Sequence, residues 1–386
     1  MKITHVETFT CGNPWKNWLF TRVHTDEGLY GTGEGTANGL ARTVEAAIHE
    51  LEPYFLGLSP FQTELIHQRM WREIYADGGQ VQGCAVAAIE MACWDIMGKA
   101  LGKPVYDLLG GRCHDKLRVY ANGWYQGDRT PEGFAERAKG VIDRGYTGLK
   151  FDPFGAAWRH MSRYEEDLSI DIIRAVRDAV GPTVDVLVEA HNRFTVEQAV
   201  TIARRIEEFR PTCLEAPVPP QNIAMMVEVA RRSPVPIACG EDYHRPEQFT
   251  ELLKHEVVQI LQPEPLHLGG LGATKKVAGM VDAHGGVVCP HSAQGPVCTA
   301  TCAHLNTATP NFYLHEYVDA FNEEQNPWVG QVLLHDFAVR DGYLFVPDAP
   351  GLGIDLNLDL IAEHPYRKDN IICLFESGWE DKEHYQ

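Results

Sequence analysis

From about residue 117 onward, short apolar segments alternate with amphipathic ones, and this alternation restricts the fold more than any other feature of the chain. Eight segments have the length and composition of strands: 118–123, 148–152, 184–191, 212–217, 236–242, 257–264, 286–291 and 312–316. Helical patterns lie between them, for example at 168–180, 196–209, 223–232, 246–253 and 273–284. Strands joined by helical crossovers form a parallel sheet, and eight of them favour a closed barrel. A doubly wound open sheet is the alternative, but no Gly-rich phosphate-binding turn follows any strand.

The region before the barrel follows a different pattern. Two strand-like segments, 2–9 and 17–24, precede helical patterns at 42–52, 62–75 and 84–101. Strands followed by helices predict a separate α+β domain. Strand character returns at 343–347, which suggests that the C-terminus leaves the barrel and rejoins this domain. We therefore expect an N-terminal domain at 1–116, a barrel domain at 117–322 and a C-terminal segment at 323–386.

The acidic composition restricts the partners of the protein. The chain has 34 Lys and Arg against 53 Asp and Glu, a formal net charge of −19. Binding to nucleic-acid phosphates requires a basic surface, so no nucleic-acid partner is expected. No segment approaches the ~20 apolar residues of a membrane span, and MKITHVETFT lacks the apolar core of a signal peptide. Together with ten scattered cysteines and no CxxC pair, this predicts a cytoplasmic protein without a membrane partner.

Three glutamates recur with the period of the strand–helix unit. Glu189, Glu215 and Glu241 are separated by 26 and 26 residues, and each lies near the C-terminal end of a predicted strand. In a β/α barrel these ends meet at one rim, which is where such barrels carry their active sites. One such glutamate could be an unrelated surface residue, but three in register favour a common site. Because converging carboxylates repel one another and oxygen ligands suit Mg²⁺, we expect one Mg²⁺ per subunit there.

Further titratable residues follow at nearly the same spacing. Glu264 follows Glu241 by 23 residues, His291 follows Glu264 by 27, and Glu316 follows His291 by 25. The chain contains 17 histidines, so a single histidine is weak evidence by itself, and it is the spacing that makes His291 a candidate.

Three more candidates lie on neighbouring predicted strands. Lys150 and Asp152 end one of them, where Lys150 either binds a substrate carboxylate or forms a rim ion pair with Asp152. His191 lies two residues beyond Glu189, and the alternation of side chains along a strand predicts that both face the same side.

A divalent cation flanked by bases is suited to removing a proton next to a carboxylate. The resulting enediolate requires charge stabilisation, which a metal ion supplies. One histidine can accept the proton and a second can protonate a leaving hydroxyl. The chain shows neither a phosphate-binding loop nor a GxSxG nucleophile motif, which disfavours phosphoryl transfer and hydrolysis.

Two longer segments resemble a known family. AAIEMACWDIMGKALGKPVYDLLGG (87–111) and VPDAPGLGI (346–354) resemble signatures of the enolase superfamily, in its mandelate racemase-like branch. Sites of this superfamily combine Lys or His bases with Mg²⁺. The resemblance implies an α/β fold, a modified (β/α)₇β TIM-like barrel with an α+β N-terminal capping domain completed by the C-terminal tail. It also implies metal ligands on strands 3, 4 and 5, which match Glu189, Glu215 and Glu241.

Within this branch, VYANGWYQ (119–126), LKFDPFG (149–155) and EAHNRF (189–194) resemble sugar-acid dehydratases that act on gluconate or galactonate. The resemblance implies that His291, supported by Glu264, takes the C2 proton, and that His191 helps the C3 hydroxyl to leave. The product would be a 2-keto-3-deoxy acid. The racemases' KxK motif is replaced by Lys-Phe-Asp at 150–152, which argues against a two-base racemase.

The chain departs from the branch at three positions. Glu264 stands where Asp is usual, Ala216 replaces a second Glu on strand 4, and Glu189 replaces the more frequent Asp ligand. None of these changes removes a ligand, an acid or a base. Similar members also suggest that a protonated Glu316 hydrogen-bonds the substrate carboxylate, with a structural ion pair as the alternative.

Substrate specificity is expected to come from loops over the barrel. Trp15, Asn17 and Asp77 are the candidate substrate contacts, in segments 15–18 and 75–79 that could form a lid. A packed aromatic loop is the alternative. The long segment 153–165 carries Arg159, His160 and Arg163, which could hold an anionic sugar acid.

These observations predict a hydro-lyase that dehydrates a small-molecule sugar acid, with gluconate or galactonate as the first candidates. The alternatives within the superfamily are an aldarate dehydratase, a cycloisomerase or an epimerase. The alternative outside enzymology is a metal-binding barrel without turnover. The resemblance also implies a homo-oligomer, from dimer to octamer.

Overall fold

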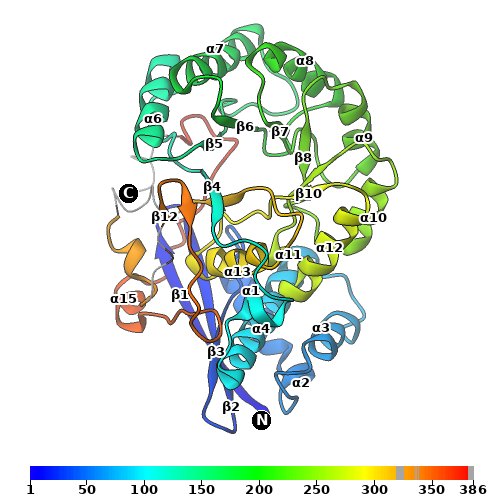
Figure 1. The fold of residues 1–386 in the computed structure, drawn as a ribbon, viewed down its shortest axis with the longest axis vertical. Helices are drawn as coiled ribbons and strands as arrows, with labels where there is room; N and C mark the ends of the chain where they lie inside the picture. Colours follow the sequence, from blue (N-terminus) through cyan, green and yellow to red (C-terminus); the bar gives the residue numbers. More distant parts are fainter. Residues whose placement is uncertain (319–325, 335–336, 338, 381–386) are drawn as a thin grey trace.

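A computed structural model describes residues 1–318, 326–334, 337 and 339–380. Eight parallel strands form a closed barrel (Figure 1): β4 (Leu117–Ala121), β5 (Gly148–Phe151), β6 (Asp185–Glu189), β7 (Cys213–Glu215), β8 (Ile237–Cys239), β9 (Ile260–Leu261), β10 (Val287–Val288) and β11 (His315–Tyr317). β11 pairs with β4, and Tyr313 N donates to Val288 O at 2.9 Å beside β10, so the circle is complete. The predicted barrel is therefore confirmed, and the open sheet is excluded.

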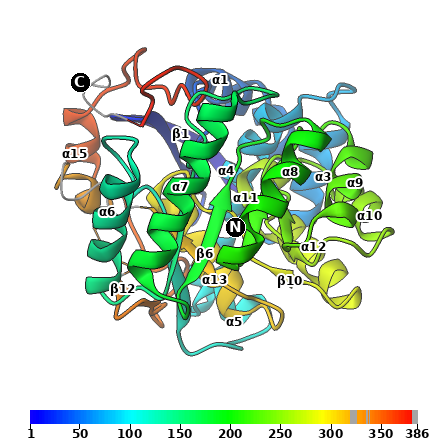
Figure 2. The ribbon, with the colours of Figure 1, turned by 90° about the horizontal axis from the view of Figure 1, so that it is seen from above.

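Helices surround the barrel in the order that the sequence predicts. They are α6 (Pro131–Asp143), α7 (Arg163–Val180), α8 (Val196–Ile206), α9 (Ile223–Arg232), α10 (Pro246–Leu253), α11 (Pro265–Leu268), α12 (Leu271–Ala283) and α13 (Pro296–Thr307). Figure 2 shows α6 to α9 following one another around the outside. Helix α7 begins at Arg163, five residues before the predicted start, because the Ser162 side chain accepts a hydrogen bond from Glu165 N and caps the helix.

The N-terminal region packs a sheet against a long helix. Strands β1 (Ile3–Asn13), β2 (Lys16–Thr25) and β3 (Tyr30–Glu34) form an antiparallel sheet, and helices α1 (Ala41–Glu50), α2 (Glu52–Phe55), α3 (Thr63–Arg72), α4 (Gly79–Leu101) and α5 (Val105–Leu108) follow. Gly31 and Gly33 of β3 lie so close to α4 that a Cβ at either would overlap the carbonyl oxygen of Ala92 or Ala88. The α+β region predicted before the barrel is therefore present, and it covers one end of the barrel (Figure 1).

Two buried carboxylates attach this region to the barrel. Glu90 of α4 accepts hydrogen bonds from Leu271 N at 2.8 Å and Gly272 N at 2.9 Å, at the first residues of α12. Glu34 of β3 accepts one from Cys298 N at 2.7 Å, in the first turn of α13. Each carboxylate therefore satisfies orphan N–H donors of a barrel helix and opposes the positive end of its dipole.

The C-terminal segment contacts both earlier parts. Its elements are β12 (Val339–Arg340), β13 (Tyr343–Leu344) and α15 (Leu358–Glu363). β13 pairs antiparallel with β4, while Asp355 accepts hydrogen bonds from Arg22 at 2.7 Å and Tyr30 at 2.5 Å. The expected domain boundary between 322 and 323 lies outside the described residues, so the three-part division stays a prediction. Among the described residues, no helix is both long and apolar enough to cross a membrane.

Candidate active site

The three periodic glutamates converge at the C-terminal rim of the barrel. Glu189 and Glu215 are the last residues of β6 and β7 and are partners in that ladder, and Glu241 lies two residues beyond β8. Each offers a carboxylate oxygen within 4.8 Å of those of the other two. Glu189 and Glu215 are fully buried. The equal spacing in the sequence therefore corresponds to a common site in space.

The electrostatics of this triad fit a divalent cation. Burial, followed by the charge of Glu189, raises the pKa of Glu215 to about 8, and burial raises the pKa of Glu241 to about 7. Oε2 of Glu189 and Oε2 of Glu215 are buried and have no hydrogen-bond partner among the described residues. A bound cation would coordinate the buried oxygens that accept no hydrogen bond. Its charge would also favour the ionised form of the carboxylates, and a set of oxygen ligands suits Mg²⁺.

Lys150 lies among the carboxylates. Its Nζ is 2.6 Å from Glu215 Oε1, 2.8 Å from Glu316 Oε1 and 3.5 Å from Glu189 Oε2. Burial opposes the charge of Lys150, but Glu215 and Glu316 raise its pKa well above the ordinary value. In the described part of the chain, Lys150 forms ion pairs with these glutamates. The alternative, a rim ion pair between Lys150 and Asp152, is not found there.

Glu316 is held by donors on both oxygens. Oε1 accepts from Asn122 Nδ2 at 2.8 Å as well as from Lys150, and Oε2 accepts from Ser292 N at 2.7 Å. Although burial opposes ionisation, Lys150 and His291 lower the pKa of Glu316 to about 2. The ion pair with Lys150, which was the structural alternative for Glu316, is therefore present in this structure, and contact of Glu316 with the substrate carboxylate stays a prediction.

His291 and Glu264 form a dyad. Nδ1 of His291 is hydrogen-bonded to the carboxylate of Glu264, so the longer glutamate reaches the imidazole where aspartate is usual. Nε2 lies 3.5 Å from Glu241 Oε2 and 3.9 Å from Glu316 Oε2. Burial works against protonation of His291, but Glu316, Glu241 and Glu264 together raise its pKa to about 10. The dyad thus holds the ring in one orientation, with Nε2 directed at the carboxylates.

His191 has a different support. Its Nδ1 is 2.6 Å from Asp152 Oδ2, and the guanidinium of Arg193 donates to the same oxygen. Asp152 and Arg193 are fully buried. Burial raises the pKa of Asp152, but the charge of Arg193 lowers it, and the net shift is downward. Arg193 was missed in the sequence, although it lies within the EAHNRF segment, because nothing in its spacing distinguishes it from a surface arginine.

A tight turn, rather than strand alternation, brings His191 into the site. β6 ends at Glu189, and His191 and Asn192 have φ angles of 43° and 58°, both in the left-handed region. Arg193 N donates to Ala190 O at 3.2 Å, which closes the turn with the two positive φ angles of type I′. Non-glycine residues pay a steric cost in this conformation, and such strain is concentrated at functional sites. The sequence therefore predicted the correct side of the sheet for His191, but the turn places the side chain there and strand alternation does not.

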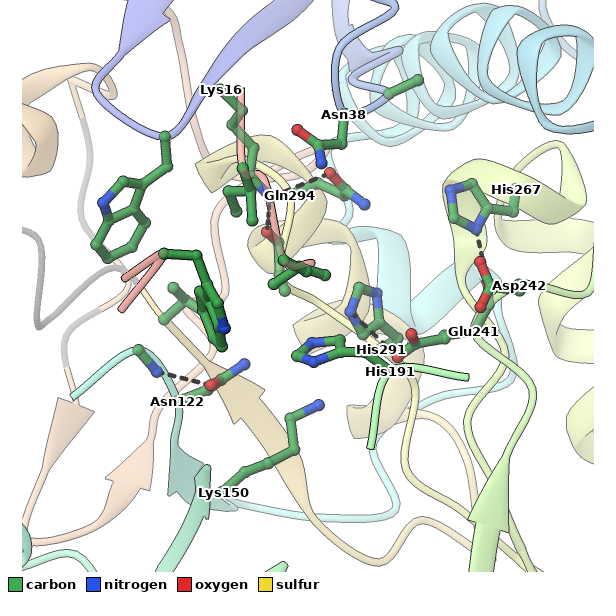
Figure 3. Close-up of a pocket in the computed structure, with 18 of the residues that line it drawn as sticks. Lys16, Asn38, Asn122, Lys150, His191, Glu241, Asp242, His267, His291 and Gln294 are labelled. Atoms are coloured by element: carbon green, nitrogen blue, oxygen red, sulfur yellow. Dashed lines mark hydrogen bonds and ion pairs between the residues drawn. The ribbon is translucent and has the colours of Figure 1, made fainter. Parts of the chain in front are cut away.

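Lys150, His191, Glu241 and His291 line one pocket. Figure 3 shows His191, His291 and Glu241 close together, with Lys150 pointing toward them. The N-terminal region contributes Trp15, Lys16 and Gln80, the loop after β4 contributes Asn122 and Tyr125, and the C-terminal segment contributes Ile372, Leu374 and Trp379. Of these contributors, Trp15 and Lys16 lie in the 15–18 segment that the sequence marked as a candidate lid.

Asn17 and Asp77 do not line the pocket. β2 begins at Lys16, so 16–18 is strand rather than lid loop, and strand alternation directs Lys16 into the pocket and Asn17 away from it. Lys16 Nζ donates to Ala293 O at 2.6 Å, two residues beyond His291. Asp77 is exposed and pairs with Arg245 at 3.2 Å. Neither Asn17 nor Asp77 is therefore placed where this pocket would present it to a substrate.

The 153–165 segment reaches the site only at its edge. Arg159 lines a neighbouring cavity, which shares His191 and Glu241 with the main pocket, and its guanidinium stacks on Trp158. His160 and Arg163 line neither cavity, so their expected contact with a sugar acid is not seen.

The chain is similar to known proteins over nearly its whole length. Residues 13–110 match the N-terminal domain of the mandelate racemase / muconate lactonizing enzyme family, and residues 133–360 match the enolase C-terminal domain-like family. It is 34% identical over 365 residues to the D-galactonate dehydratase of Verminephrobacter eiseniae, covering 94% of each chain. It is also 34% identical over 367 residues to the D-gluconate dehydratase of Thermoproteus tenax, covering 95% of this chain and 73% of that one.

Solved structures give the same result. The mandelate racemase/muconate lactonizing enzyme from Jannaschia sp. CCS1 superposes with a TM-score of 0.88 at 33% identity, covering 95% of this chain and 98% of that one. The mandelate racemase/muconate lactonizing enzyme-like protein from Roseovarius sp. TM1035 superposes with a TM-score of 0.89 at 30% identity, covering 95% and 96%. The capped barrel described above is thus an architecture shared with solved structures.

Proposed function

This chain belongs to the mandelate racemase/muconate lactonizing enzyme family of the enolase superfamily, and from that membership we propose that it is a Mg²⁺-dependent dehydratase of a gluconate- or galactonate-type aldonic acid. Its relatives named above are sugar-acid dehydratases, so the chain is a lyase. One observation carries the finer proposal: two carboxylate-supported histidines, His191 and His291, line one pocket beside the glutamate triad. Removal of water from an acid of this kind needs a base for one proton and an acid for the departing hydroxyl.

Glu189, Glu215 and Glu241 would hold the cation. When bound, Mg²⁺ would stabilise the negative charge that develops on the substrate carboxylate as the C2 proton leaves. Lys150, which contacts Glu215 and Glu316, adds a fixed positive charge at the same rim.

His291 takes the C2 proton on Nε2, while Glu264 fixes the ring through Nδ1 and stabilises the imidazolium that forms. A base must be neutral before it accepts a proton, so the negative charge that raises the pKa of His291 has to be balanced before reaction. His191 gives a proton to the C3 hydroxyl, which leaves as water. The remaining enol tautomerises to the 2-keto-3-deoxy acid.

The arrangement also argues against a two-base racemase. Asp152, at the position of the second lysine of the racemases' KxK motif, is bound by His191 and Arg193 and is not a free base. We therefore favour dehydration over epimerisation, with C2 deprotonation as the step common to both. We also propose that the protein is a cytoplasmic homo-oligomer. Each chain would divide into three parts at about residues 116 and 322.

A substrate screen tests the proposed reaction. The Mg²⁺-loaded protein should convert at least one member of a library of aldonic and aldaric acids into a 2-keto-3-deoxy acid, measured by semicarbazide absorbance. EDTA should abolish the signal and added Mg²⁺ should restore it. A protein that forms no keto acid but exchanges the C2 proton in D₂O would be an epimerase or isomerase instead, and a protein with neither activity would be a binding protein.

Two variants separate the roles of the histidines. His291→Ala should abolish C2 exchange in D₂O together with dehydration, because it removes the base. His191→Ala should reduce dehydration by about 10²–10⁴-fold, the usual range for a general acid, while C2 exchange persists. Equal and complete loss of exchange in both variants would contradict the assignment.

A further inference from the structure

The part of the chain that follows the family match reaches the pocket. The enolase C-terminal domain-like match ends at residue 360, yet Ile372, Leu374 and Trp379 line the same cavity as His191 and His291. We call residues 366–380 the tail segment. None of its residues was a candidate from the sequence, because no spacing rule relates it to the barrel strands.

The tail segment is fixed at both ends. At its start, Asn17 of the β1–β2 hairpin donates to Arg367 O at 2.8 Å and accepts from Arg367 N at 2.9 Å. At its end, Gly127 N donates to Glu380 O at 2.9 Å, in the loop after β4. The segment therefore runs from the N-terminal sheet to the barrel rim, across the His191 side of the pocket.

Trp379 of this segment has a ring contact with His191. Its side chain is 6% exposed, and its Nε1 donates to Gly155 O at 3.2 Å, in the loop after β5. The indole meets the His191 ring edge-on, with centroids 6.3 Å apart and planes at 89°, and it meets Tyr125 in the same way at 6.2 Å. Aromatic rings in this arrangement attract one another and leave the remaining edge available as an apolar wall.

We propose that the tail segment, through Trp379, forms the wall of the substrate pocket beside His191 and determines how the carbon chain from C3 onward is held. This inference rests on the proposed dehydratase function. The indole would contact the C–H groups of the aldonic acid and keep bulk water away from the acid that protonates the C3 hydroxyl. Trp379 would then be a specificity-determining residue contributed from outside the barrel and outside the capping sheet.

The test compares two rates in the same samples. Trp379→Ala should lower 2-keto-3-deoxy acid formation about tenfold or more, the usual effect of losing one good pocket contact, while C2 exchange in D₂O changes less than about twofold. Trp379→Phe keeps an aromatic edge and should recover most of the dehydration rate. Ser377→Ala, an exposed position in the same segment, is the matched control and should behave as the original protein.

Three outcomes would overturn the inference. An unchanged ratio of dehydration to exchange in Trp379→Ala would show that the ring does not act on the elimination step. A parallel fall of both rates with a lower melting temperature would show a purely structural role. If Trp379→Ala does not fold, Leu374→Ala, at a half-buried position that lines the pocket, replaces it. An unchanged KM of this variant for the aldonic acid would also contradict the proposal that the tail segment forms a pocket wall.

Failure of this inference is distinguishable from failure of the proposed function. If the original protein forms keto acid and Trp379→Ala does so equally well, only the role of the tail segment is wrong. If the original protein forms no keto acid from any sugar acid, the dehydratase proposal is wrong, and the tail inference falls with it.

Discussion

Outside the glutamate triad, each buried acid of the site is paired with a different basic neighbour. Asp152 is paired with Arg193 and His191, Glu264 with His291, and Glu316 with Lys150. The triad of Glu189, Glu215 and Glu241 shares Lys150 and His291 with these acids, and its pKa values are raised. At the scale of single residues, the site is therefore balanced everywhere except where a cation would bind.

This imbalance predicts the effect of Glu215→Gln. Without divalent cations at pH 8.5, the variant should unfold at a higher urea concentration than the original protein. Burial and Glu189 raise the pKa of Glu215 to about 8, so its ionised form destabilises the fold at this pH, and Lys150 keeps its contact with Glu316 in the variant. Mg²⁺ at about 100 times its Kd should stabilise the original protein by ~2.7 kcal/mol and the variant by much less. Glu208→Gln, at an exposed position, serves as the control for charge removal. A variant that is less stable than the metal-free original would contradict the argument.

Among the elements, the interior of a helix or strand was easier to predict than its end. The order of strands and helices and the positions of Glu189, Glu215 and Glu241 follow from periodicity, which is a local property of the chain. The start of α7 depends on the cap at Ser162, and the first turn of α12 depends on Glu90 from a distant helix. Periodicity carries no information about such partners.

The same limit explains the errors at the site. Asn17 was expected to contact substrate because it lies in the 15–18 segment, a candidate lid, but it binds Arg367, 350 positions away. His191 was expected to follow strand alternation, but a type I′ turn replaces the strand after Glu189. Contacts of this kind depend on the completed fold, so a single sequence identifies the residues without their orientations.

The junction between α4 and α12 predicts a pH effect at the scale of elements. Burial raises the pKa of Glu90 to about 7, although Gly272 N, Trp94 and Leu271 N favour its ionised form. An acid whose pKa is higher in the folded protein contributes stability below its unfolded pKa of about 4.5, and this contribution is lost as pH rises through 7.

The unfolding free energy of the original protein relative to Glu90→Gln should therefore fall by about 2–3 kcal/mol between pH 5 and pH 8. Urea denaturation at both pH values measures the difference. Glu50→Gln, on the exposed face of α1, should show no such trend. A difference that is constant with pH would mean that Glu90 is ionised throughout.

At the scale of the whole molecule, the three expected parts meet at one buried histidine. His304 of α13 accepts a hydrogen bond from Tyr106 N of α5 at 3.2 Å and binds Leu352 O of the C-terminal segment at 3.1 Å. Its ring is fully buried, and burial lowers its pKa to about 4. The neutral form of His304 is therefore part of the packed junction.

A histidine with a lowered pKa contributes stability above its unfolded pKa of about 6.5, and this contribution is lost as pH falls through 4. The original protein should lose ~2 kcal/mol of unfolding free energy between pH 7 and pH 5 through His304 alone. His304→Gln should remove this part of the slope, while His49→Gln on the surface should leave it in place. Equal slopes in all three proteins would contradict the assignment.

The bond between Asn17 and Arg367 also bears on how the chain is made. During synthesis the β1–β2 hairpin leaves the ribosome early, but its partners at His364 and Arg367 arrive only after the whole barrel has been translated. Contacts so distant in sequence form late, because their loop must close first. Until then the hairpin carries open hydrogen-bonding groups, and its apolar side chains that pack with the barrel and the C-terminal segment, Trp18 and Phe20 among them, stay uncovered, so the nascent chain is exposed to aggregation for most of its translation. A chaperone that holds the N-terminal sheet during this interval should raise the yield of active protein more than one that acts after release.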